Sequence, residues 1–106
     1  MTDKLLVLVT CRSPKEAREI SRAVVEARLA ACANIFQSTV QSIYRWKGSV
    51  ESAREVLVML KTSRRRFVAL EREIRRLHSY DVPEIIALPI GRGSVEYLQW
   101  LADSTK

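Results

Sequence analysis

The chain has 106 residues, 47% of them hydrophobic, so we expect a single domain over residues 1–106 with its own core. Two cysteines are too few for the disulfide framework of a small secreted protein, which predicts a reduced, cytoplasmic setting. The apolar run near the N-terminus is too short for a signal peptide or a membrane span, so we expect no membrane partner.

The first predicted element is a strand, followed by a helix. Residues Leu5 to Thr10 form a continuous apolar run, which is typical of a strand covered on both faces near the centre of a sheet. Ser13, Pro14 and Glu16 fit the positions of a capping box, so they predict a helix start. This helix should end near Leu29. Its buried stripe is expected to contain Ala17, Ile20, Val24 and Ala27.

A long hairpin is predicted next, with strands at Cys32 to Trp46 and Val50 to Thr62 and a turn at Lys47 and Gly48. The first strand would have 15 residues and would reach roughly 50 Å. A compact chain of this size has a radius of gyration of about 13 Å. Because bare strand edges invite association, we expect the hairpin to bend or to pair with another subunit in a closed homo-oligomer.

A second helix is predicted from roughly Ser63 to Ser79, and it should stop before Val82 and Pro83, because the residue before a proline favours extended geometry. Its apolar stripe is expected to contain Phe67, Leu70, Ile74 and Leu77. The next segment, Glu84 to Ile90, is predicted to be the last strand.

Two further features describe the C-terminal part. Pro89 cannot donate a ladder hydrogen bond and therefore favours an edge position or a bulge for the last strand. Ser94 is predicted to cap a short terminal helix. The apolar side of that helix is expected to contain Val95, Leu98 and Leu101.

The resulting order is βαββαβ with a terminal helix, which predicts the α+β class and a ferredoxin-like arrangement with both main helices on one face of an antiparallel sheet. The right-handed crossover rule favours this topology. It also places the first and third strands, the two most apolar ones, in the middle of the sheet.

The net charge of +6 is concentrated in six arginines, namely Arg64, Arg65, Arg66, Arg72, Arg75 and Arg76. Such a stripe is one feature of nucleic-acid binding. On a helix, however, these arginines would occupy the positions left free by the apolar stripe, and Phe67, the one aromatic residue among them, belongs to that stripe and not to a stacking platform. We therefore favour a solvated helix face and do not expect nucleic acid as a partner.

Three separated blocks of sequence resemble one known family. They are RLAACANI (residues 28–35), SIYRWKGSVE (residues 42–51) and LHSYDVPEIIALPIGRGSVEYLQWL (residues 77–101). They resemble the CutA family of divalent-cation tolerance proteins, and the resemblance covers nearly the whole chain. It implies a homotrimer of ferredoxin-like subunits, similar in build to PII signalling proteins, whose long hairpin strands pair between subunits.

The same resemblance implies a role in tolerance of copper and other divalent metals, with copper bound by some members. This chain departs from the family pattern at Ser79, where a proline is common. Only His78 matches a pair of histidines that serve as ligands in a relative, and Cys11 lies one residue from the matching cysteine position.

Cys11, Cys32 and His78 are the candidate metal ligands, because thiolate and imidazole suit copper and zinc. Each also has a structural alternative. Cys32, between two alanines, fits a small core residue. Cys11 precedes a helix N-terminus, which can lower a thiol pKa, or it is simply structural. His78 either binds metal or caps the carbonyls at a helix end.

A second group of candidates belongs to an interface or an intersubunit cleft. Tyr44 and Trp46 share one side of the hairpin tip, and we favour subunit packing over ligand stacking for these aromatic residues. Polar candidates that could converge near such a cleft are Glu55, Lys61, Tyr80 and Glu84.

No catalytic motif is found in the sequence, so we expect a protein that is not an enzyme. The leading hypothesis is a cytoplasmic homotrimer that binds divalent metal, copper above all, and takes part in metal tolerance. The alternative is a regulatory scaffold like the PII proteins, which would bind a small anion or a partner protein in its intersubunit clefts.

Overall fold

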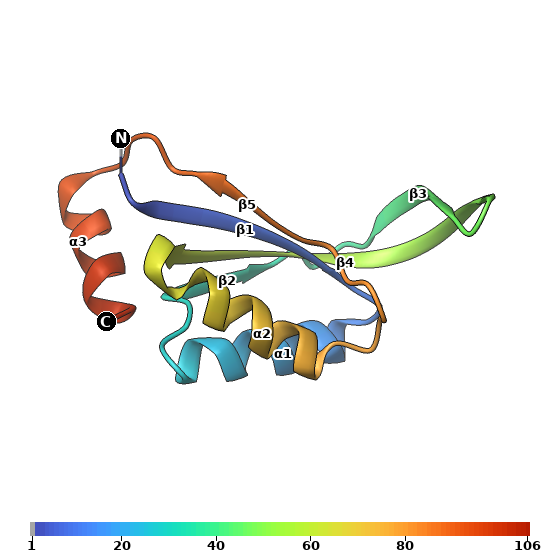
Figure 1. Ribbon diagram of the computed structural model, residues 1–106, viewed down its shortest axis with the longest axis horizontal. Helices are drawn as coiled ribbons and strands as arrows, with labels where there is room; N and C mark the ends of the chain where they lie inside the picture. The colour runs from blue at the N-terminus through green and yellow to red at the C-terminus, as the bar shows by residue number, and fades with distance from the viewer. Residues whose placement is uncertain (1) are drawn as a thin grey trace.

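The computed structural model describes residues 2–106 and shows one antiparallel sheet with two helices on one face (Figure 1). The strand order is β2-β4-β1-β5, and β3 extends the hairpin on β4. The strands are β1 (Lys4–Cys11), β2 (Cys32–Ile35), β3 (Val40–Trp46), β4 (Ser49–Ser63) and β5 (Ile85–Pro89). The predicted α+β class is confirmed, with the two most apolar strands in the middle and the proline-containing strand at an edge.

The helices are α1 (Pro14–Glu26), α2 (Phe67–Leu77) and α3 (Val95–Ser104). Figure 1 shows α1 and α2 side by side below the sheet and α3 at the end where the N-terminus lies. None of the helices within residues 2–106 is long and apolar enough to cross a membrane.

The core fills the space between the sheet and the two helices. Its fully buried side chains include Val7, Val9, Val56, Val58 and Leu60 from the strands and Ile20, Val24, Leu70 and Ile74 from the helices. Three residues of the stripe predicted for α1 are therefore confirmed. The fourth, Ala27, is an exposed C-cap, because α1 ends at Glu26 and not near Leu29.

The predicted caps at Ser13 and Ser94 are confirmed, and three other details of the helices differ from the predictions. Ser13 Oγ accepts a hydrogen bond from the Glu16 amide at 3.1 Å, as a capping box requires. The Glu16 carboxylate, however, accepts from the amide of Arg12 and not from that of Ser13. The second helix opens with a 3₁₀ turn at Arg64–Arg66. In α3, Val95 is 83% exposed, because only the C-terminal half of this helix, around Leu101, packs inward.

The other face of the sheet has neither α1 nor α2 over it. Leu6 and Leu8 of β1 are half-buried on this face, and strand register places Leu8 between Met59 and Ile86. We call this the open sheet face; it consists of Leu6, Leu8, Leu57, Met59, Ile86 and Leu88. The apolar run of β1 predicted cover on both faces, and one chain supplies full cover on only one of them.

The hairpin turns at Lys47 and Gly48, as predicted, and both residues have positive φ (49° and 83°), as a type I′ turn requires. The strand predicted at Cys32 to Trp46 is divided, because residues 36–39 stand opposite only residues 56–57 of β4. This bulge separates β2 from β3 at a polar stretch. The distal half of the hairpin projects beyond the helices (Figure 1), and the molecule is 44 Å long.

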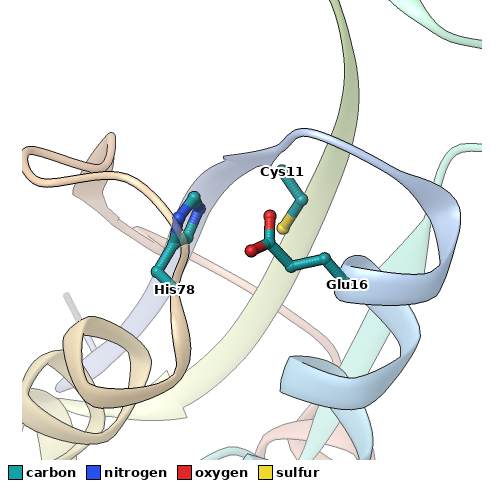
Figure 2. Close-up of side chains that lie close together, drawn as sticks. All are labelled: Cys11, Glu16 and His78. Atoms are coloured by element: carbon teal, nitrogen blue, oxygen red, sulfur yellow. The ribbon is translucent and has the colours of Figure 1, made fainter.

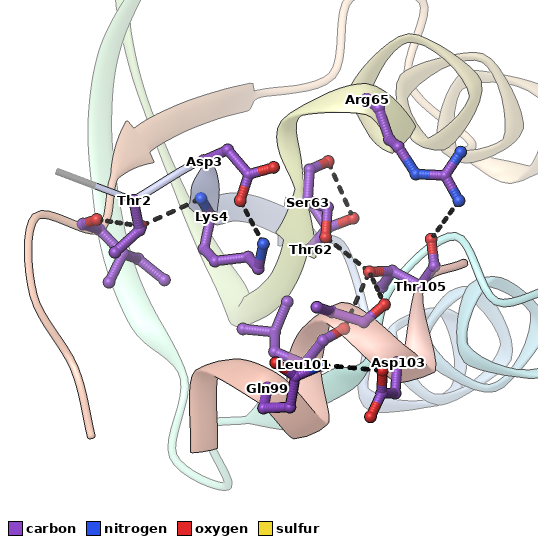
Figure 3. Close-up of polar contacts among 12 residues, drawn as sticks. Thr2, Asp3, Lys4, Thr62, Ser63, Arg65, Gln99, Leu101, Asp103 and Thr105 are labelled. Atoms are coloured by element: carbon purple, nitrogen blue, oxygen red, sulfur yellow. Dashed lines mark hydrogen bonds and ion pairs between the residues drawn. The ribbon is translucent and has the colours of Figure 1, made fainter. Parts of the chain in front are cut away.

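Polar contacts hold the C-terminus against β4 and the 3₁₀ turn (Figure 3). Ser63 Oγ lies 2.6 Å from Thr105 Oγ1, which donates to the carbonyl of Leu101 at 2.8 Å. The Arg65 and Arg66 guanidinium groups donate to the Thr105 carbonyl. Two members of the arginine stripe are therefore engaged in contacts within the chain.

Candidate functional site

Three side chains from separate elements converge at one end of the sheet (Figure 2). Cys11 ends β1, Glu16 lies in the first turn of α1, and His78 follows α2. Their potential ligand atoms all lie within 4.8 Å of one another. Within residues 2–106 this is the one group of three or more such side chains with this spacing, and we call it the strand-end cluster.

Cys11 is fully buried, and this decides its chemistry. Burial, assisted by the negative charges of Glu16 and Glu55, raises the pKa of the Cys11 thiol to about 12. The lowered thiol pKa that a helix terminus can produce is therefore not found at Cys11, because desolvation outweighs any effect of that terminus. Burial agrees with the structural alternative for this residue. Near neutral pH this side chain is a protonated thiol.

Glu16 connects the start of α1 to the segment after α2. Its Oε1 accepts from the Arg12 amide at 3.0 Å and its Oε2 from the Ser79 amide at 2.8 Å. Partial burial is the largest single influence and opposes ionisation, but the hydrogen bonds from Ser79 and Arg12 together outweigh it and lower the pKa of Glu16. Sequence reasoning assigned Glu16 to a cap only; its capping-box position, which turns the carboxylate back toward β1, was the available clue.

His78 is 8% exposed and uses both ring nitrogens. Nε2 lies 2.8 Å from the Thr10 carbonyl, and Nδ1 accepts from the Tyr80 amide at 3.1 Å. A carbonyl only accepts and an amide N–H only donates, so these partners select the neutral ring with its proton on Nε2. The ring therefore does not cap the carbonyls of α2, which was one of the two predicted roles.

Cys32 lies apart from the strand-end cluster. Its partner on β4 is Lys61 and that of Cys11 is Val56, and five residues of strand separate these partners by about 17 Å. Cys32 is half-buried on an edge strand, in a groove that Trp100 also lines. The structure therefore brings together two of the three predicted metal ligands and adds Glu16 to them.

Thiol, carboxylate and imidazole are donor types that copper and zinc accept. Tetrahedral coordination at 2.0–2.3 Å would place such donor atoms about 3.3–3.8 Å apart, so a cluster within 4.8 Å needs only a small contraction. Two interactions within the chain oppose metal binding. The Cys11 thiol carries a proton, and the lone pair of His78 Nδ1 already accepts a hydrogen bond. Cys11, Glu16 and His78 fit a metal in kind and spacing, but only in competition with these interactions.

A cleft of about 550 Å³ lies between the base of the hairpin and the segment after α2. We call it the hairpin cleft; it is lined by Thr10, Ser42, Ile43, Tyr44, Trp46, Glu55, Tyr80, Asp81, Val82 and Glu84. It unites five of the six predicted interface or cleft residues. The sixth, Lys61, is elsewhere, with its Nζ 5.6 Å from the Tyr97 ring centroid.

One hydrogen bond organises the hairpin cleft. Tyr80 Oη donates to Glu55 Oε2 at 2.9 Å. Burial, followed by this bond and the charge of Glu55, raises the pKa of Tyr80, so the phenol stays a donor. Sequence reasoning missed Asp81, although it directly follows Tyr80. The cleft and the strand-end cluster are neighbours, because the backbone groups that bind His78 belong to the cleft residues Thr10 and Tyr80.

Comparison with known proteins gives a consistent result. A model of the family described as CutA1 divalent ion tolerance protein matches residues 5–104. The divalent-cation tolerance protein CutA of Thermus thermophilus is 48% identical over 100 residues, which cover 94% of this chain and 96% of that protein. Protein CutA of Homo sapiens is 49% identical over 98 residues; these cover 92% of this chain and 54% of that protein, so the chain spans about half of its length.

Solved structures agree with the sequence comparison. The divalent cation tolerance protein (Cut A1) from Thermus thermophilus matches with a TM-score of 0.94 at 47% identity, covering 97% of this chain and 99% of that one. CutA from Xylella fastidiosa matches with a TM-score of 0.95 at 34% identity, and the match covers 99% of this chain and 100% of that one.

Proposed function

Because the chain belongs to the CutA1 family of divalent ion tolerance proteins, we propose that it acts in divalent-cation tolerance as a homotrimer that binds copper or a similar ion at the strand-end cluster. The role we propose is one of binding and not of catalysis. We also propose a cytoplasmic location, which the two free cysteines, Cys11 and Cys32, support.

The open sheet face supports the proposed assembly. Its leucine, isoleucine and methionine side chains form a continuous apolar surface across three neighbouring strands, and Ile86 and Leu88 are 50% and 45% exposed. Contiguous apolar surface of this kind marks an interaction site. The projecting hairpin adds two long strand edges that a neighbouring subunit would cover.

The spacing of Cys11, Glu16 and His78 is the observation that carries the metal-binding part. A metal ion held there would supply a positive charge that favours the thiolate form of Cys11. Because the pKa of this thiol is about 12, binding near neutral pH must displace its proton. We therefore propose weak binding that strengthens by about tenfold for each unit of pH.

The test is isothermal titration of the reduced, metal-free protein with Zn²⁺ and Cu⁺ at pH 6, 7 and 8, with the assembled mass measured by light scattering in each buffer. Zn²⁺ is included because it does not oxidise thiols. Cys11→Ser and His78→Asn should each weaken binding by tenfold or more. Cys32→Ser is the matched control, because Cys32 lies outside the strand-end cluster.

Three results would contradict the proposal. Affinity independent of pH would mean that no thiol proton is displaced. Equal losses in the Cys11→Ser and Cys32→Ser variants would place the metal elsewhere. A monomeric mass at all protein concentrations would contradict the proposed homotrimer.

The hairpin cleft favours one alternative, a regulatory scaffold like the PII proteins. Its volume of about 550 Å³ falls in the range of small-molecule sites. The carboxylates of Glu55, Asp81 and Glu84 line it, however, and they disfavour the small anion considered from the sequence. A rise in unfolding temperature with a cellular ligand or partner protein in metal-free buffer would support this alternative.

A further inference from the structure

The side of α2 that points away from the sheet carries a stripe of arginines around one valine. The stripe begins in the 3₁₀ turn before α2, and its members follow one another at intervals of three, four and three positions, so they share one helix face. All of them are exposed, whereas Leu70 and Ile74 on the opposite side are fully buried. We call this stripe the outer face of α2; it consists of Arg65, Val68, Arg72 and Arg75.

The positive charge of this outer face is not neutralised within the chain. None of its three arginines forms an ion pair with another residue in the described range 2–106. Arg65 donates only to the Thr105 carbonyl, at 3.4 Å. Of the two acidic residues of α2, Glu73 accepts from the Arg76 guanidinium at 2.7 and 2.9 Å, and Glu71 forms no ion pair with the face. Three guanidinium charges are therefore available to a partner.

The neighbouring helix differs in its charge pattern. α1 lies beside α2 in the same layer (Figure 1), and most of its exposed basic residues are paired with acids. Lys15 lies 3.9 Å from Glu19, and Arg22 lies 3.5 Å from Glu26, while Arg18 is unpaired within residues 2–106. The excess positive charge is therefore confined to a strip one helix wide, about 15 Å long at 1.5 Å per residue.

Val68 adds an apolar contact in the middle of this strip. Its side chain is 65% exposed, with Arg65 three positions before it and Arg72 four positions after it. A phosphate backbone or a headgroup layer would gain little from a valine. Both are also broad enough to meet Glu19 and Glu26 on α1, which would repel them. The narrow strip instead fits a single peptide segment that combines carboxylates with an apolar side chain.

The proposed assembly leaves this surface free. The apolar surface and the strand edges assigned to subunit contacts are the open sheet face and the hairpin. α1 and α2 lie together on the opposite side of the sheet (Figure 1). The outer face of α2 would therefore stay accessible in a monomer and in a trimer.

We propose that the outer face of α2 binds an acidic segment of another protein, with carboxylates paired to Arg65, Arg72 and Arg75 and an apolar side chain against Val68. Guanidinium groups suit this role because they bind carboxylates through two parallel hydrogen bonds. The contact area of one short helix is small, so the complex is a weak, transient one. The inference requires neither the metal nor the trimer of the proposed function.

The experiment measures fluorescence anisotropy of a dye-labelled acidic peptide, a threefold repeat of Glu-Glu-Leu-Ala, titrated with the metal-free protein in its native assembly. The buffer contains about 100 mM NaCl, which screens charges more than about 10 Å apart. A peptide with glutamine in place of glutamate is the neutral control. Duplex DNA and vesicles of phosphatidylserine and phosphatidylcholine are tested as competing polyanions.

The variants separate this surface from the net charge of the chain. Arg72→Gln combined with Arg75→Gln removes two charges from the outer face of α2. Arg18→Gln combined with Arg22→Gln is the matched control, because both residues are exposed on α1 and the net charge falls equally. Val68→Gln removes the apolar contact. Thermal unfolding of each variant shows whether it is folded.

We expect the acidic peptide to bind at least about tenfold more tightly than the neutral one. The double glutamine variant on α2 should weaken binding by about fivefold or more, and the variant on α1 by less than about twofold. Val68→Gln should weaken it by about threefold. Arg72→Glu combined with Arg75→Glu should reverse the preference, so that a peptide with lysine in place of glutamate binds better than the acidic one.

Equal losses in the two double glutamine variants would assign binding to net charge and overturn the proposal. Equal binding of the neutral peptide, or no binding of the acidic peptide up to about 1 mM, would do the same. Tighter binding of DNA or vesicles that depends on Arg72 and Arg75 would replace the protein segment by nucleic acid or membrane. Should the charge-reversed variant fail to fold, the two glutamine variants still decide. Metal affinity at Cys11 enters none of these measurements, so failure here is distinct from failure of the proposed function.

Discussion

Replacing His78 by alanine tests whether the strand-end cluster holds the fold together without any metal. The substitution removes the donor to the Thr10 carbonyl and the acceptor for the Tyr80 amide. An unpaired buried polar group costs about 1–3 kcal/mol. Thr10 is 7% exposed, so leaving its carbonyl unpaired should cost a free energy in that range. Tyr80 is only half-buried, so the loss of a partner for its amide should cost less. We expect His78→Ala to lower the free energy of unfolding by about 2–4 kcal/mol.

The assay is urea unfolding of the metal-free protein, followed by circular dichroism at one fixed protein concentration, because subunit association contributes to apparent stability. His78→Asn is the comparison, since its Oδ1 can accept from the Tyr80 amide and should recover about 1 kcal/mol. A loss below about 0.5 kcal/mol in His78→Ala would show that these hydrogen bonds contribute nothing measurable.

The same reasoning has a spectroscopic check. The chain contains one histidine, so its ring nitrogens give unambiguous NMR signals. We expect the neutral ring to carry its proton on Nε2, because Nδ1 accepts from Tyr80. Finding the proton on Nδ1 would refute the arrangement and the stability estimate with it.

Three further predictions concern the local structure. The pKa of Glu16 is lowered in the folded state, so its carboxylate stabilises the fold at pH values above the ordinary pKa of 4.5, and this contribution is lost as the pH falls through the lower folded pKa. Glu16→Gln should therefore make the free energy of unfolding fall less steeply as the pH is lowered on the acid side. Ser13→Ala removes the α1 cap and should cost about 1 kcal/mol in urea unfolding, whereas Ser13→Asp should cost almost nothing. Lys47 has positive φ, a conformation that asparagine adopts more readily than lysine. Lys47→Asn should therefore raise the free energy of unfolding by up to about 1 kcal/mol, seen as a higher thermal midpoint, and a lower midpoint would contradict the type I′ turn.

Regular elements were predictable where one local rule dominated. The Ser13 cap, the apolar stripe of α2 and the Lys47–Gly48 turn each depend on a few adjacent residues, and the structure confirms all three. Predictions were wrong where the outcome depended on a distant partner. Val95 has the right spacing for the apolar side of α3, yet it is exposed, because only the second half of that helix reaches the sheet.

The candidate sites follow the same division. Cys11 and His78 were chosen from the sequence as chemically suitable, but their separation of 67 positions gave no distance between them. Glu16 was predicted only as a cap, and its second hydrogen bond, to Ser79, depends on where α2 ends. The sequence left the role of the Cys11 thiol open, because the burial that raises its pKa is a property of the folded neighbourhood and not of position before a helix.

The sequence by itself determined the order of elements, the strands at the centre and edge of the sheet, and the family, because apolar periodicity, caps and turn residues act over short stretches and the family blocks are contiguous. Only the tertiary structure decided that Cys11 is a buried, protonated thiol, that Cys32 stands apart, and that acidic and aromatic residues share one cleft in a basic chain. Proximity, desolvation and the sign of a local field depend on residues that folding brings together from distant positions.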